Sequence, residues 1–392
     1  MSETELRHLM AAIDVPPTRA DVQQAMVDGR RRSRNRAVVG AAVAVLVVAG
    51  GVVAVTQVNR PSSATPVPAT PASKAAGCTV ETYKVPEKWT AGTIDAIDDT
   101  GRYLVGTLST GTVRTPVRWQ HGVPAPLAGA TGSAGPVNSS GVVAGADIDE
   151  NDHLLGWVWK NGKMTRLAAP SGYLWTVPQG INARGDVVGF ATSALYVSIP
   201  VLWPADHPGT VVKLQMPAGL GASHANFSRA TGIDEHGTIV GVILGRPVRW
   251  SADGLATPLP LPGPAPTSGG GDAGTVGAIR GHFAFGTFYA KPAGSTLNDK
   301  SLVTAVRWDL RAGTVTSLAV GHFNGVSGAA TGGAVTWNDD PNPSARITPD
   351  GRLIPLNQPS GGGALALEMS ADGSTIIGQT RGDSSRPVVW HC

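Results

Sequence analysis

The feature that most constrains the fold is a segment of about 45 residues that recurs seven times. Each copy has an Ile-Asn or Ile-Asp pair before a Gly turn, then a Val-Val-Gly run, then an apolar run ending in Trp; the fourth copy spans Gly232 to Leu259. The repeated Trp residues are Trp119, Trp159, Trp203, Trp250, Trp308, Trp337 and Trp390. They cover 390 − 119 = 271 residues in six intervals, the spacing of four-stranded propeller blades. Because each copy holds four short β-prone runs, the sequence predicts an all-β, seven-bladed β-propeller.

The seventh copy lacks its fourth run, because the sequence given stops at Trp390-His391-Cys392. The run from Val80 to Pro86 resembles the fourth runs of other copies, so we expect this N-terminal strand to complete the seventh blade and close the ring. Antiparallel pairing would then bring Cys78 next to Cys392. The sequence therefore predicts a Cys78–Cys392 disulfide in place of a turn, with two free thiols as the alternative.

The pattern resembles the HAF-type extracellular repeat, which has Ile-Asn, two residues, Gly, Val-Val-Gly, a variable gap, and an apolar run ending in Trp. The third copy, Ile181 to Trp203, is closest to this signature, and the resemblance covers about residues 94 to 390. It implies a WD40-like, propeller-type array on the surface of a bacterial cell or secreted from it. The family carries no established catalytic residues, so none is transferred.

An uncharged apolar segment precedes the repeats. From Ala37 to Val55 the chain is almost unbroken Ala, Val, Leu and Gly, long enough as a helix to cross a bilayer. Five Arg residues lie just before it, which predicts a cytoplasmic N-terminus. The alternatives are a cleaved signal peptide or a lipoprotein modified at Cys78. We therefore expect a cytoplasmic segment with short helices (1–36), a transmembrane helix (37–58), a Pro/Ser/Ala-rich linker (59–77) and an extracellular propeller (78–392).

The distribution of charge argues against nucleic acid as a partner. Residues 1–60 contain eight Arg and five acidic residues, a net charge of +3. Residues 78–392 contain 22 basic and 23 acidic residues, a net charge of −1. The high isoelectric point therefore comes from the residues beside the membrane segment, and the propeller as a whole is not basic.

Loop length suggests where a ligand would bind. The turns between the first and second runs are short in every copy, whereas the loops at the other end of the blades vary in length. Variable loops on a fixed scaffold commonly carry function. The candidate ligand-binding residues on that face are Tyr173, Trp175, His224, Asn226, Tyr289 and Lys291. Such aromatic and polar groups suit a protein, peptide or glycan partner, and the alternative is that they only pack their own loops.

Motifs for other chemistry are weak. Asp147, Asp149 and Asn151 imitate a calcium loop, but the Gly and Glu that complete such a loop are missing, so we expect no metal and no cofactor. No nucleophile-elbow or P-loop motif is present. The sequence predicts a non-catalytic, membrane-tethered binding module. The alternatives are a transmembrane sensor whose residues 1–36 bind a regulator, and a propeller lyase or glycan hydrolase.

Overall fold

The computed structural model describes most of the chain from Gly77 onward. The described residues are 77–207, 209–216, 228–251, 254–263, 274–289, 303–321, 323–337, 344–360, 362–382 and 384–392. The cytoplasmic segment, the transmembrane helix and nearly all of the linker that the sequence predicts lie outside them. Within these ranges, no helix is long and apolar enough to span a membrane.

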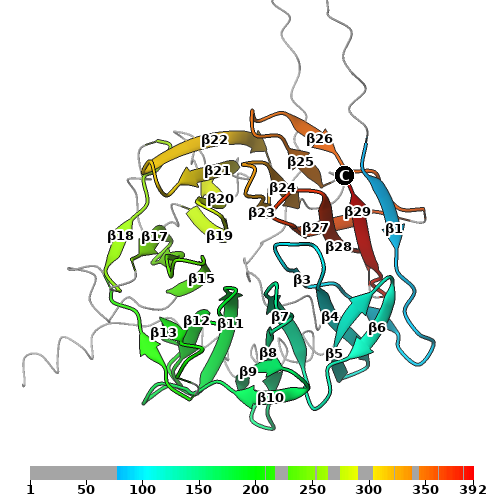
Figure 1. Cartoon of the computed structure of the whole chain (residues 1–392), viewed down its shortest axis with the longest axis horizontal. Coiled ribbons are helices and arrows are strands. Elements are labelled where there is room, and N and C mark those ends of the chain that lie inside the picture. Colours follow the sequence, from blue (N-terminus) through cyan, green and yellow to red (C-terminus); the bar gives the residue numbers. More distant parts are fainter. Residues whose placement is uncertain are drawn as a thin grey trace, which may run out of the picture. The chain divides into compact units, whose positions relative to one another are not determined.

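Seven antiparallel sheets stand around a common axis (Figure 1). Blade 1 has β2 (Ala91–Gly92), β3 (Ala96–Ile97), β4 (Leu104–Thr110), β5 (Val113–Gln120) and β6 (Val123–Pro126). Blade 2 has β7 (Ser133–Val137), β8 (Val143–Ile148), β9 (Leu154–Lys160) and β10 (Lys163–Arg166). Blade 3 has β11 (Trp175–Ile181), β12 (Val187–Thr192), β13 (Ser198–Trp203) and β14 (Val212–Lys213). Blade 4 has β15 (Arg229–Ile233), β16 (Ile239–Ile243), β17 (Arg246–Trp250) and β18 (Ala256–Pro258).

The remaining three blades complete the ring. Blade 5 has β19 (Gly274–Arg280), β20 (Phe283–Tyr289), β21 (Val303–Asp309) and β22 (Thr314–Gly321). Blade 6 has β23 (Gly325–Gly328), β24 (Ala334–Trp337), β25 (Ala345–Ile347) and β26 (Leu353–Pro355). Blade 7 has β27 (Ala364–Met369), β28 (Thr375–Thr380), β29 (Pro387–His391) and β1 (Thr79–Thr82). The prediction of an all-β, seven-bladed propeller is confirmed.

The first and last strands of the domain share one sheet. β1 pairs with β29 in antiparallel register, from Thr79 opposite His391 to Thr82 opposite Val388, so the N-terminal strand completes blade 7 (Figure 1). Cys78 and Cys392 form a disulfide with their Cα atoms 4.1 Å apart. The closure predicted from the truncated seventh copy is therefore correct, and it seals a sheet edge that would otherwise be open.

The repeated Trp packs one blade onto the next. Five of these indoles donate Nε1–H to a carbonyl just past the last strand of the preceding blade, at 2.7 to 3.1 Å; they are Trp159, Trp203, Trp250, Trp308 and Trp390. A large apolar ring with one polar atom fits a seam between sheets only if that atom finds an acceptor. The recurrence of Trp thus reflects both the area it buries and the carbonyl it satisfies.

Blade 6 corrects one of the seven assignments. Trp337 lies on β24, the second strand, where its backbone pairs with Gly325. The residue of blade 6 in the Trp register is Ile347 on β25, which pairs with Ala334 as Trp250 pairs with Ile239. Ile347 is fully buried. The sixth copy thus keeps the strand but has a smaller apolar side chain in place of Trp.

A steric constraint explains why Gly recurs in the Val-Val-Gly run. In six blades the first strand bulges toward the second, and a Cβ at this Gly would lie 1.8 to 2.4 Å from a carbonyl oxygen of the first strand; the residues are Gly106, Gly145, Gly189, Gly241, Gly286 and Gly378. In blade 6 the equivalent residue is Thr336, and the pairing of β23 with β24 runs without a bulge. The bulge and the Gly therefore occur together or not at all.

Candidate functional site

The described loop-face residues predicted to bind a ligand are divided between two blades. At the start of β11, Trp175 packs against Tyr196 with the rings tilted by 58° and their centroids 4.9 Å apart, and it lies 6.1 Å from the ring of His153. Tyr173 packs on the same blade, with the Lys213 ammonium 5.2 Å from its ring centroid. Tyr289 ends β20 and packs against the core between blades 5 and 6. His224, Asn226 and Lys291 lie outside the described residues.

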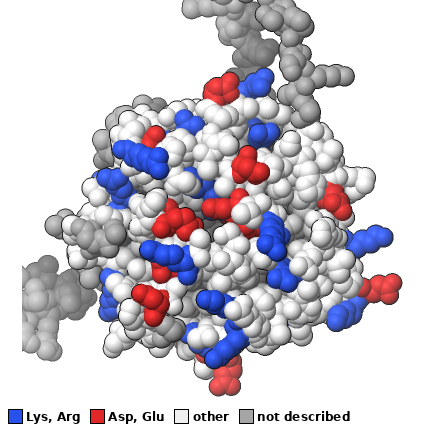
Figure 2. Space-filling model, in the orientation of Figure 1, with Lys and Arg blue, Asp and Glu red and all other residues white. Residues whose placement is uncertain are grey.

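The cavity found in the structure is at the opposite end of the blades from these loops. It has a volume of about 290 Å³ and lies where the first strands and their following turns surround the axis. Blades 1 to 5 contribute to it. Figure 2 shows acidic and basic side chains gathered around the centre of the ring. The candidate site is therefore enclosed by the short turns of constant length, and not by the variable loops at which the sequence predicts a ligand.

The cavity has a mixed lining, in which polar residues outnumber apolar ones. Its apolar residues include four at or next to the ends of first strands; these residues are Val137, Ile181, Ile233 and Ile279. The turns that follow bring Asp99, Glu235, His236 and His282 to its lining. A small hollow that combines apolar side chains with polar groups is typical of a small-molecule site.

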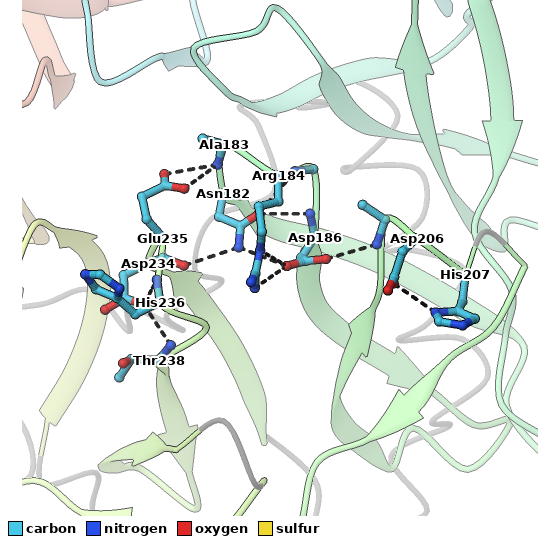
Figure 3. Close-up of polar contacts among 12 residues, drawn as sticks. Asn182, Ala183, Arg184, Asp186, Asp206, His207, Asp234, Glu235, His236 and Thr238 are labelled. Atoms are coloured by element: carbon cyan, nitrogen blue, oxygen red, sulfur yellow. Dashed lines mark hydrogen bonds and ion pairs between the residues drawn. The ribbon is translucent and has the colours of Figure 1, made fainter.

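The turns at the mouth are shaped by Asn and Asp side chains. Asn182 Oδ1 accepts hydrogen bonds from the backbone N–H groups of Gly185 and Asp186, and Asp234 Oδ1 accepts from those of His236 and Thr238 (Figure 3). Such bonds replace the backbone pairing that a tight turn leaves unmade. The Ile-Asn or Ile-Asp pair of the repeat is therefore a turn-forming device.

An Asn at this position also links neighbouring blades. Asn138 Nδ2 donates to the carbonyl of Asn182 at 2.8 Å, and Asn182 Nδ2 donates to the carbonyl of Asp234 at 3.2 Å. This ladder joins blades 2, 3 and 4. It ends at blade 4, because the Asp234 carboxylate has no N–H to donate to blade 5; the equivalent residue of blade 5 is Arg280, and the cavity adjoins this break.

Arg280 reaches across to blades 7 and 1. Its Nη2 is 2.5 Å from Glu368 Oε1, and its Nε is 3.0 Å from Asp99 Oδ1. Glu368 also accepts the backbone N–H of Ile97 at 3.1 Å through Oε2. Burial raises the pKa of Glu368, although the Arg280 guanidinium opposes this rise. Burial acts to lower the pKa of Arg280, but the Glu368 and Asp99 carboxylates outweigh it and raise that pKa.

Glu368, like Arg280, departs from the repeat. The residues that pair with the second strand at the position of Glu368 are small in five other blades; they are Ala96, Gly180, Gly232, Ala278 and Ser327. Glu368 occupies this position in blade 7, opposite Ile377. Two side chains that break the repeat thus form one ion pair beside the axis. Aligning the seven copies would have revealed both departures, though not that they meet.

Glu235 is an acidic group at the cavity mouth. Both of its carboxylate oxygens accept the backbone N–H of Ala183, at 3.0 and 2.9 Å (Figure 3). Partial burial raises the pKa of Glu235, and the neighbouring charges of Asp99 and Asp234 raise it further. Asp234 is committed to its own turn, so Glu235 and Asp99 are the acidic groups available to a ligand here.

Asp95 supplies a pH-dependent prediction. It lies in the bulge between β2 and β3, accepts a hydrogen bond from Thr107 Oγ1 at 3.0 Å, and has a pKa raised by burial to about 6. Because this folded pKa exceeds the unfolded value, the folded state binds more protons between about pH 4 and 6, and stability falls as pH rises through that window. We expect Asp95→Asn to raise the free energy of unfolding by about 2 kcal/mol at neutral pH and to leave it unchanged below about pH 4. Urea unfolding at both pH values measures this, and an equal effect at both would contradict it.

The calcium-like segment is a turn. Asp149 Oδ1 accepts the backbone N–H groups of Asn151 and His153, and these bonds hold the pKa of Asp149 below its usual value. Within the described ranges, no group of three or more His, Cys, Asp or Glu side chains is arranged to hold a metal ion.

Comparisons with known proteins assign no family to the chain. No family model and no curated protein matches the sequence. Among solved structures, a catalytically inactive virginiamycin B lyase from Staphylococcus aureus is 12% identical, with 80% of this chain and 99% of that chain covered and a TM-score of 0.49. The β-propeller domain of Swd1 from Myceliophteria thermophila is 13% identical, with coverage of 80% and 100% and a TM-score of 0.47. An oligogalacturonate lyase from Vibrio parahaemolyticus is 8% identical, with coverage of 80% and 97% and a TM-score of 0.46.

Proposed function

We propose that this chain is a membrane-tethered exoplasmic binding module that takes a small ligand into the axial cavity without transforming it. The observation that carries the proposal is the cavity of about 290 Å³ that five blades enclose. Its polar groups include Asp99 and Glu235, two carboxylates on the turns at its mouth.

The geometry of the domain fits a tether on the cavity side. Cys392 donates its backbone N–H to the carbonyl of Ser374 at 2.7 Å. Ser374 lies in the turn between β27 and β28, the first and second strands of blade 7. The disulfide therefore holds Cys78, where the linker joins the propeller, at the same end of the blades as the cavity. A linker over 59–77 would span at most about 68 Å when extended, which limits how far the cavity mouth would lie from the membrane. In this proposal the N-terminus is cytoplasmic and residues 1–36 remain available to a regulator.

The test is ligand capture by the full-length protein in nanodiscs. A library of small polar molecules is screened by thermal shift, and each hit is measured by calorimetry on wild type, on Glu235→Gln, and on Glu150→Gln as a matched control. Glu150 is an exposed acid in the loop between β8 and β9, at the other end of the blades. We expect hits that weaken about tenfold or more in Glu235→Gln and stay unchanged in Glu150→Gln. Hits that bind both variants alike would contradict a cavity site.

A second candidate is a propeller enzyme. Asp99, Glu235, His236 and His282 all line the cavity, and such groups can transfer protons. Mass spectrometry of each hit after incubation separates the two functions. A ligand recovered intact supports binding alone, whereas a product formed by wild type and lost in Glu235→Gln supports catalysis.

A further inference from the structure

The charges around the axial cavity are unequally available to a ligand. Arg280 is already matched by two carboxylates, Glu368 at 2.5 Å and Asp99 at 3.0 Å, and only 14% of its side chain is exposed. The Arg249 guanidinium donates through Nη1 to the carbonyl of Leu310 at 3.0 Å. Two of the cationic groups in the cavity lining are therefore engaged with protein acceptors, and Arg311 lies exposed in the turn before β22.

The acidic groups are less satisfied. Asp99 uses Oδ1 for Arg280 and keeps 47% of its side chain exposed. Glu235 is held in place by the Ala183 N–H, a neutral donor. The Arg184 guanidinium lowers the pKa of Glu235, but its own hydrogen bonds go to Asp186. The charges of Asp99 and Glu235 also oppose each other across the mouth, which is one cause of the raised pKa of Glu235. A positive charge placed between them would remove that repulsion.

Part of the wall below the mouth is hydrocarbon. Val137, Ile181, Ile233 and Ile279 each precede the turn of their own blade, and the polar Asn138, Ser139 and Thr238 line the cavity beside them. The four aliphatic side chains offer no oxygen ligand to a bare inorganic cation. A ligand with a cationic head and an apolar body would match both levels of the cavity.

We infer that the axial cavity binds a small organic ammonium ion, its charged nitrogen between Asp99 and Glu235 and its hydrocarbon part against the apolar residues of blades 2 to 5. This inference rests on the proposed function and adds the chemical class of the ligand. An ammonium group donates up to three hydrogen bonds, so it can satisfy both carboxylates at once. The volume of about 290 Å³ limits the body to a small alkyl or ring group.

The experiment compares three probes of one shape and different charge: cyclohexylamine, cyclohexanol and cyclohexanecarboxylate. Each is titrated by calorimetry into the full-length protein in nanodiscs, with empty nanodiscs as the blank. The variants are the double substitution Asp99→Asn with Glu235→Gln, which keeps side-chain shape and removes charge, and Glu150→Gln as the control. Circular dichroism melts of each variant verify that the propeller is folded.

We expect wild type and Glu150→Gln to bind the amine at least about tenfold more tightly than the alcohol or the carboxylate, and the double variant to lose that preference. If the alcohol or the carboxylate binds best and the double variant alters its affinity, the ammonium inference is overturned and the cavity remains the ligand site. If the probes bind every variant alike, the cavity site itself is overturned. Absence of amine binding at millimolar concentration overturns the inference.

Discussion

Replacing Arg280 with methionine is expected to lower the free energy of unfolding by about 3 kcal/mol at neutral pH. Methionine keeps much of the apolar length of the side chain but leaves Glu368 without its partner at 2.5 Å. Glu368 has only 22% of its side chain exposed, so water would replace that partner poorly. Removing one member of a buried ion pair lowers the free energy of unfolding by more than the pair's net contribution, because the other charge remains desolvated.

The pH dependence identifies the cause. Burial already raises the pKa of Glu368 and Arg280 opposes that rise, so removing the guanidinium raises this pKa further. A carboxyl whose folded pKa lies above its unfolded value destabilises the fold most when ionised. The deficit of Arg280→Met should therefore shrink as pH is lowered and Glu368 takes up a proton. Urea unfolding of wild type and variant at neutral and at acidic pH measures this.

A second substitution provides the control. Adding Glu368→Gln to Arg280→Met removes the stranded charge, so the double variant should be more stable than Arg280→Met alone at neutral pH, and this difference should shrink on acidification. If Arg280→Met loses the same stability at both pH values and Glu368→Gln gives no recovery, then Arg280 acts through packing and the ion pair carries little energy.

The number of blades and the order of their strands could be predicted from the sequence, because the same packing contacts recur in each blade. The Trp that seals a seam, the Gly under a bulge and the Asn or Asp that closes a turn each recur for a local reason, so their period gave the strand order and the blade number. The error at Trp337 has the same origin. The sixth copy matches the repeat least well: its Trp lies on the second strand, and Ile347 occupies the position on the third strand where other blades have Trp. Nothing in the sequence around Ile347 identifies it as that position.

The site could not be predicted in this way, because it consists of departures from the repeat. Loop length drew attention to Tyr173, Trp175 and Tyr289, which the structure distributes over two blades. The turns around the axis have nearly constant length, and only side-chain identity distinguishes Arg280 and Glu368. That Arg280 meets residues 88 positions later and near the start of the ring follows from ring closure, which no single copy encodes.

Removing the disulfide is expected to cost about 3 to 5 kcal/mol of unfolding free energy, in the variant Cys78→Ser with Cys392→Ser. The bond joins residues 314 positions apart, and the chain-entropy relation for such a loop gives about 5.7 kcal/mol as an upper value. Without the disulfide, the N-terminal strand is held by four residue pairs between β1 and β29 and by Tyr83, which packs in the core between blades 7 and 1. β1 itself is mostly exposed, so we expect its four pairs to open more readily once the disulfide is removed.

The loss should begin at the seam. With the disulfide absent, β1 can separate from β29 before the other blades open, so amide hydrogens of Thr79 to Thr82 should exchange faster while those of β16 in blade 4 keep their protection. Hydrogen exchange followed by mass spectrometry measures both, and reduced wild type serves as the matched comparison. Equal stability and unchanged exchange at β1 would mean that the strand pairing alone closes the ring. A seam that opens first would instead show that the Cys78–Cys392 bond keeps strand β1 in blade 7.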